Sequence, residues 1–300
     1  MEYSFEMRQS FITKARILAF VILLSAPLMA SAQVEINEAN FPDETFRSWL
    51  YEQDYGKDGV LTEAEINAIT AIDVSWNTIS DLKGIEHFTA LTFLDCSGNQ
   101  LTTLDVSKNT ALAKLDCSKN LLTALDVSRN TALTFLDCSK NSLTALDVSK
   151  NTALTYLDCS GNRLTALDVS KNTALTFLDC SQNPLTTLDV SKNMALITLY
   201  CYSNQFTALD VSNNTALTAL SCRNNQLTAL DVSKNTVLTG LYCYNNQIKG
   251  ASMDALIASL PQQEKGTLCV YDNSEGNEGN VCTKAQVAAA EAKGWSVLGD

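Results

Sequence analysis

The sequence is poor in the residues on which most enzymes and nucleic-acid-binding proteins depend. It has a single histidine, His87, and 21 basic residues against 33 acidic ones, which gives a net charge of −12. That charge would repel nucleic acid and anionic membrane surfaces. The sequence contains neither a Gly-rich phosphate loop nor a Gly-x-Ser-x-Gly motif. We therefore predict a folded protein that is not an enzyme and binds no nucleic acid.

Long hydrophobic runs are also lacking after the first 32 residues. Three basic residues precede the apolar run of residues 17–29, and Ala30-Ser31-Ala32 follows it. This order is typical of a signal peptide cleaved after small residues, and the run is shorter than the roughly 20 residues of a membrane span. We predict that residues 1–32 are a signal peptide. The mature chain is then secreted, periplasmic or at the cell surface, without a transmembrane segment.

A strict period of 21 residues runs through the middle of the chain. One unit reads Leu91-x-x-Leu94-x-Cys96-x-x-Asn99-x-Leu101, and its second half reads Leu104-x-Val106-x-x-Asn109. A fixed period of 20 to 50 residues is typical of a solenoid, and this pattern is that of a leucine-rich repeat. We predict an α/β solenoid of leucine-rich repeats, mostly short parallel β-strands with few helices, over residues 69–250. The eight repeating cysteines are Cys96, Cys117, Cys138, Cys159, Cys180, Cys201, Cys222 and Cys243.

Alternation along each predicted strand assigns its side chains to two faces. Leu94 and Cys96 should point inward, whereas Phe93, Asp95 and Ser97 should point outward. The repeating asparagines should cap the turning backbone of their own coil and of the next. No histidine accompanies the cysteines and no Cys-x-x-Cys pair occurs, so we expect buried thiols that only pack.

These repeats resemble the internalin class of bacterial leucine-rich repeat proteins. The resemblance rests on halves of the form LxxLxC and LDVSxNTxL and on the cysteine ladder, and it covers about residues 35–250. It implies a secreted or surface-held solenoid that binds host or neighbouring-cell ligands through its concave sheet, without catalysis. It also implies an N-terminal cap that is similar to a truncated EF-hand.

Both ends of the solenoid are predicted to carry caps, because terminal coils would otherwise expose apolar edges. Residues 33–68 form the helical N-terminal cap, and residues 251–300 form a β-α-β C-terminal cap. The loop in the first cap fits an EF-hand at several positions, although Gly56 stands where an oxygen ligand is expected. Two interpretations stay open, a calcium site or a cap without metal. The candidate calcium ligands are Asp54, Asp58, the Val60 carbonyl, Thr62 and Glu65, and no other cofactor is predicted.

Two cysteines, Cys269 and Cys282, lie outside the 21-residue period. In an exported protein they are candidates for a disulfide.

Equivalent outward positions vary in the Cys half of the repeats and hardly at all in the Val half. Aspartate, serine and mostly lysine fill the Val half, as expected of an indifferent scaffold. Aromatic residues and an arginine on an exposed sheet are typical of protein and sugar contacts. The alternative is cross-strand stacking that only stiffens the sheet. The candidate ligand-binding residues are Phe93, Phe135, Tyr156, Phe177, Tyr200, Tyr202, Arg223, Tyr242 and Tyr244.

Two functional hypotheses follow from the sequence. The first is an exported, non-catalytic binding protein that recognises a protein or glycoconjugate ligand through the Cys-half sheet. The second is a structural envelope protein that associates with copies of itself.

Overall fold

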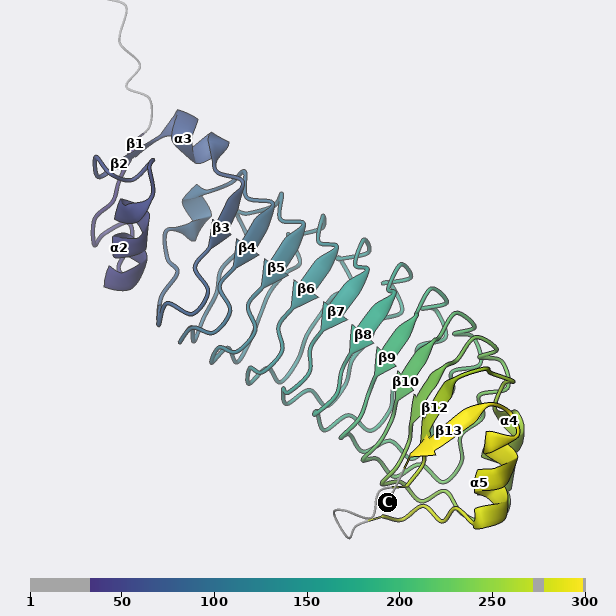
Figure 1. Cartoon of the computed structure of the whole chain (residues 1–300). Helices are drawn as coiled ribbons and strands as arrows, with labels where there is room; N and C mark the ends of the chain where they lie inside the picture. The colour runs from purple at the N-terminus through teal and green to yellow at the C-terminus, as the bar shows by residue number, and fades with distance from the viewer. Residues whose placement is uncertain (1–32, 272–277, 299–300) are drawn as a thin grey trace, which may run out of the picture. The chain divides into compact units, whose positions relative to one another are not determined.

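The computed structural model describes residues 33–271 and 278–298. In this part of the chain, eleven parallel strands form one sheet and follow one another in sequence order from β3 to β13 (Figure 1). A separate two-stranded sheet joins β1 (Gln33–Glu35) to β2 (Val60–Thr62). None of the described helices is long and apolar enough to cross a membrane. The predicted signal peptide, residues 1–32, lies outside the described residues.

The predicted leucine-rich repeat solenoid is confirmed, and each coil contributes one strand of three residues. From β4 onward, each repeat strand ends directly before a ladder cysteine, and equivalent residues of neighbouring strands pair in register. The Val half of each repeat forms turns instead of a second strand. The repeat strands are β3 (Ala71–Asp73), β4 (Phe93–Asp95), β5 (Lys114–Asp116), β6 (Phe135–Asp137), β7 (Tyr156–Asp158), β8 (Phe177–Asp179), β9 (Thr198–Tyr200), β10 (Ala219–Ser221) and β11 (Gly240–Tyr242).

The inward and outward faces follow the predicted alternation with one exception. Leu94 and Cys96 are fully buried, and Phe93 and Asp95 are partly exposed. Ser97, predicted to face outward, is buried. All eight ladder cysteines are fully buried thiols, as expected. Burial raises the pKa of each ladder thiol, that of Cys222 to about 12, so these side chains stay neutral and act as small apolar groups.

The asparagines of the Cys half join each coil to the one before it. The Asn141 amide nitrogen donates to the Cys138 carbonyl of its own coil at 3.1 Å and to the Cys117 carbonyl of the preceding coil at 3.0 Å. Its Oδ1 accepts from the Leu122 backbone N–H of that preceding coil at 3.0 Å. The sequence analysis predicted that each asparagine caps its own coil and the next one. That direction is wrong, because the asparagine bonds the preceding coil, and the backbone of its own coil is bonded by the asparagine of the coil that follows.

The asparagines of the Val half form a second ladder with fewer bonds. The Asn130 amide nitrogen donates to the carbonyls of Val106 at 3.0 Å and Asn109 at 2.9 Å, both in the preceding coil. Its Oδ1 is buried and has no hydrogen-bond partner. The same orphaned oxygen recurs in every member of this ladder: Asn109, Asn130, Asn151, Asn172, Asn193, Asn214 and Asn235.

The N-terminal end carries two short helices, α2 (Glu44–Glu52) and α3 (Glu63–Ala68). Asp43 caps α2, and Pro42 lies just before the helix. Helix α3 begins with a capping box between Thr62 and Glu65. The first coil is longer than the rest and forms the 3₁₀ turn η1 (Ile85–His87).

The C-terminal end adds two helices and extends the sheet. Helix α4 (Ala251–Ser259) is followed by β12 (Gly266–Cys269), which pairs with β11, and α5 (Lys284–Glu291) is followed by β13 (Trp295–Leu298), which pairs with β12. Asn280 continues the asparagine ladder here, because its amide nitrogen donates to the carbonyls of Cys243 and Val270 at 2.8 Å. The Asn280 Oδ1 accepts from the Ile248 backbone N–H, also at 2.8 Å.

Candidate ligand-binding surface

The candidate binding residues lie on one face of the sheet, which we call the strand face. Three columns of residues run across this face. The ring column is the first residue of each strand, the carboxylate column is the third, and the serine column is the residue after each ladder cysteine. Because neighbouring strands pair in register, residues of one column lie about 4.8 Å apart from strand to strand.

Aromatic rings stack along the ring column in the middle of the sheet. The ring centroids of Phe135 and Tyr156, and those of Tyr156 and Phe177, are each 4.3 Å apart, with nearly parallel planes. Phe177 then contacts Tyr200 of the carboxylate column edge to face, at 5.7 Å. The structure therefore joins four of the nine candidate residues into one continuous contact. Phe93 is separated from this stack by Lys114, which occupies its column in β5.

Carboxylates form the neighbouring column from β4 to β8. In each case Oδ1 accepts from the backbone N–H of the serine two residues on, for example Ser139 to Asp137 at 2.9 Å. Burial raises the pKa of Asp116, Asp137, Asp158 and Asp179. Neighbouring carboxylates of the column raise these pKa values further, because like charges disfavour ionisation.

The second half of the strand face is built around Arg223. Its guanidinium lies 4.2 Å from the centroid of the Tyr202 ring and 5.5 Å from that of Tyr244, and it donates to the Tyr244 hydroxyl at 2.7 Å. These three residues replace serines in the serine column. Tyr242 is half-buried at the end of β11 and lies beside Gly240. The contacts in this cluster hold the guanidinium in place between the two rings and make this aromatic part of the surface rigid.

Sequence reasoning missed Trp76, which belongs to the same face. Its side chain is 67% exposed, and its ring lies so close to Gly98 that a Cβ there would approach within 2.5 Å. The Lys119 amine lies over the ring, 4.9 Å from its centroid. Trp76, Gly98 and Lys119 share one repeat position with a left-handed backbone, and only a comparison of that position across coils would have singled out the tryptophan.

The Val half of the repeats carries its own aspartates, from Asp105 to Asp231. Their carboxylates accept hydrogen bonds from the serine two residues on, which lowers their pKa values, as for Asp147 with Ser149. A lysine or arginine three residues further on lowers most of these pKa values a little, yet these residues form no ion pair: in the described part of the chain the one pair within 4.0 Å joins Lys57 and Asp54.

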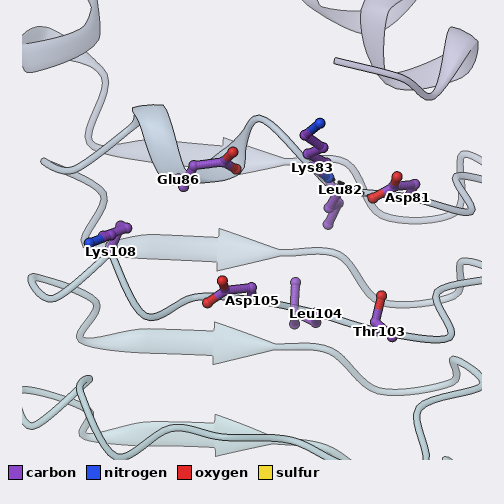
Figure 2. A pocket seen from close by; sticks show the side chains of 8 residues that line it. All are labelled: Asp81, Leu82, Lys83, Glu86, Thr103, Leu104, Asp105 and Lys108. Carbon is purple, nitrogen blue, oxygen red and sulfur yellow. Dashed lines mark hydrogen bonds between the residues drawn. The ribbon is translucent and has the colours of Figure 1, made fainter. Parts of the chain in front are cut away.

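A cavity of about 410 Å³ opens in this half, between the first and second coils (Figure 2). Its carboxylates are engaged by local backbone groups: Asp81 with the Lys83 N–H and Glu86 with the Gly84 N–H. Figure 2 shows Lys83 and Lys108 pointing in different directions. The cavity is lined by Asp81, Leu82, Lys83, Glu86, Thr103, Leu104, Asp105 and Lys108.

The candidate calcium ligands are not brought together. Asp54 pairs with Lys57, Asp58 accepts from the Val60 backbone N–H, and Glu65 is held by Thr62 in the capping box. Across the described residues no three His, Cys, Asp or Glu side chains are close enough to share a metal ion.

The glycine in this loop has a packing role. A Cβ at Gly56 would lie 1.9 Å from the Leu50 carbonyl oxygen, so close backbone packing explains a glycine where an EF-hand carries an oxygen ligand. The geometry favours the metal-free cap, and calcium binding stays a prediction.

The predicted disulfide partners lie near the end of the cysteine ladder. The thiols of both Cys269 and Cys282 contribute to the raised pKa of Cys243, which places both around it. Both side chains are half-buried. The disulfide therefore stays a prediction.

Comparisons with known proteins agree with this architecture. A family model described as leucine-rich repeats in two copies matches residues 152–193. Internalin J of Listeria monocytogenes is 45% identical over 71 residues, which are 23% of this chain and 8% of that protein. The solved functional domain of internalin J, described as including a cysteine ladder, is 37% identical, with a TM-score of 0.63 over 82% of this chain and 58% of that one.

A leucine-rich repeat protein of Leptospira interrogans shares the fold, with a TM-score of 0.67 at 22% identity over 78% of this chain and 62% of its own. The chain thus spans less than two thirds of each of these relatives. The internalin class is a non-catalytic family, in agreement with the prediction that the chain is not an enzyme. The period, the buried thiols and the likeness to the internalin J domain together show a leucine-rich repeat protein that is similar to the internalin class.

Proposed function

We propose that this protein is an exported binding module that captures a protein or glycoconjugate ligand on a host or neighbouring cell through its strand face. The observation that carries the proposal is the contrast between the two halves of the repeat. The outward side chains of the Val half repeat nearly unchanged, whereas those of the strand face vary and lie in contact with one another. A surface that recognises one ligand must differ from place to place, and a scaffold need not.

The tyrosines around Arg223 give the sharpest test. The double variant Tyr202→Ala with Tyr244→Ala removes both rings from the guanidinium, so ligand capture should be abolished. Half-exposed side chains away from the core contribute little to folding, and we expect the free energy of unfolding to fall by no more than about 1–2 kcal/mol. Capture would be measured on a mucin-type glycan array and on immobilised extracellular protein domains, with thermal unfolding measured in parallel.

The matched control is Lys150→Ala with Lys171→Ala, which removes two exposed side chains from the Val half of neighbouring coils. This variant should capture ligand normally. If it fails while the tyrosine variant binds, the ligand surface lies on the Val half. Concentration-dependent assembly of the purified protein, with no capture on either array, would instead support a structural envelope protein.

A further inference from the structure

The first half of the strand face holds a row of negative charges that the protein itself does not neutralise. The five carboxylates of β4 to β8 are paired in register, and none forms an ion pair within 4.0 Å. Three lysines border the column without forming such a pair: Lys114 lies in the ring column of β5, Lys119 is held over Trp76 and acts on Asp137, and Lys140 lies against Gly161. The column consists of Asp95, Asp116, Asp137, Asp158 and Asp179.

Beside this row, the stacked rings form an apolar wall. Because Phe135, Tyr156 and Phe177 stack face to face at 4.3 Å, their faces cover one another and mainly their edges remain for a ligand. A sugar ring that stacks on an aromatic ring needs an open face, so this half of the surface is poorly suited to carbohydrate. A lysine or arginine side chain has an apolar stem and a cationic head, and it fits an apolar wall next to a carboxylate.

We propose that the first half of the strand face, from β4 to β8, docks an extended basic segment of a protein partner. The inference rests on the proposed function and names the class of partner for that surface. Charge complementarity selects the occupant: the segment's cationic heads meet the carboxylate column, and its stems lie along the ring column. Five strands at about 4.8 Å span roughly 19 Å, the length of about six extended residues. The net charge of −12 attracts a basic segment and repels a second copy of the chain.

The experiment uses a fluorescein-labelled peptide of alternating arginine and serine, and two control peptides in which glutamate or glutamine replaces arginine. Binding to residues 33–300 is measured by fluorescence anisotropy. The arginine peptide should bind, the controls should not, and affinity should fall as salt rises from about 50 to about 500 mM, because exposed charges are then screened. The Asp137→Asn with Asp158→Asn variant should bind about tenfold more weakly.

The chain provides a closely matched control in Asp147→Asn with Asp168→Asn. These aspartates belong to the same two coils as Asp137 and Asp158 and form the same kind of Asp-x-Ser turn, but they lie in the Val half. Asparagine keeps the oxygen that accepts from serine, so both variants should fold. The control should bind the arginine peptide within about twofold of the unchanged protein.

Three results would overturn the inference: equal weakening in both variants, equal binding of the glutamine peptide, or capture of a neutral oligosaccharide that Asp137→Asn with Asp158→Asn leaves intact. Failure of the proposed function is a separate outcome. If no arginine peptide binds, yet Tyr202→Ala with Tyr244→Ala abolishes capture of an arrayed ligand, the strand face binds ligand but the basic-segment assignment is wrong.

Discussion

The Asp-x-Ser turn occurs in both halves of each repeat, and its aspartate meets opposite surroundings in the two. On the strand face, burial and neighbouring carboxylates raise the pKa of Asp116, Asp137 and their partners in the column. In the Val half, hydrogen bonds from serine act on an exposed group and lower the pKa, as for Asp147. One local sequence thus gives two electrostatic results, because the solvent around the carboxylate differs.

These shifts predict how stability depends on pH. A raised pKa in the folded state means that the strand-face carboxylates destabilise the fold at neutral pH, and that stability is regained as the pH falls toward their ordinary value of 3.8. The Val-half carboxylates, with lowered pKa values, contribute stability above 3.8, and it is lost as the pH falls below that value. The free energy of unfolding should therefore pass through a maximum at mildly acidic pH.

Urea unfolding followed by circular dichroism between about pH 3 and 7 would measure this profile. Asp137→Asn with Asp158→Asn should flatten the rise in the free energy of unfolding between neutral and mildly acidic pH, because these two side chains then no longer titrate. Lys119 is the cation that acts on Asp137 in this column. Asp147→Asn with Asp168→Asn should leave that rise unchanged. A rise that survives the strand-face substitutions would assign it to other groups.

At the scale of the elements, each coil is joined to its neighbour by two asparagines that form different numbers of hydrogen bonds. Asn141 forms bonds through both its oxygen and its nitrogen, whereas Asn130 bonds only through its nitrogen and leaves a buried oxygen without a partner. An unsatisfied buried acceptor offsets part of what the other bonds contribute. The Cys-half ladder should therefore hold the coils together more strongly than the Val-half ladder.

A pair of substitutions tests this difference. Asn162→Ala should lower the free energy of unfolding by about 2–4 kcal/mol, since it leaves buried backbone groups of two coils unpaired. Asn151→Ala, in the other ladder, should cost about 1–2 kcal/mol, because it removes two bonds together with an orphaned oxygen. Denaturant midpoints at fixed pH measure both. Equal losses would show that the Asn151 oxygen is satisfied in solution.

The sequence predicts the strand positions and the inward thiols, because both follow from a local pattern that recurs in every repeat. The Phe135–Tyr156–Phe177 stack is the cross-strand stacking that the sequence left open as an alternative to a binding role. The sequence does not predict the Trp76 ring over Gly98 or the ladder role of Asn280, because these contacts arise only when coils stack and join residues far apart in the chain. At the candidate calcium ligands the sequence has suitable residue types, but in the structure Asp54, Asp58 and Glu65 form an ion pair or hydrogen bonds with neighbouring residues.

For the whole molecule, the strict period means that all repeats have the same length, so a whole repeat can be removed without changing the pattern of those that remain. Each repeat contacts mainly its neighbours, so stability should be close to a sum over repeats and the interfaces between them. Residues 133–153 make up one period, and their removal joins Ala132 to Leu154 with the repeat pattern intact. The shortened chain should fold, with a lower denaturant midpoint.

The control is the deletion of residues 133–152, which removes one residue fewer than a full period. The junction is then out of step with the 21-residue repeat, and the inward residues of one coil no longer continue those of the next. This chain should fail to form a cooperative fold, as judged by circular dichroism and proteolysis. If both deletions fold equally well, the period does not set the register.

The backward direction of the asparagine bonds gives the solenoid a growth polarity. Each coil's carbonyls remain open until the following coil supplies its asparagine, from Asn109 bonding the first coil to Asn280 closing the last. A chain that emerges from synthesis or export with its N-terminus first can therefore be completed in the order in which it appears, each new turn sealing the one already formed. The C-terminal cap ends this process. Its Asn280 bonds the Cys243 carbonyl, which the asparagine of a further repeat would otherwise bond, and its Ser259 hydroxyl accepts from the Val232 N–H.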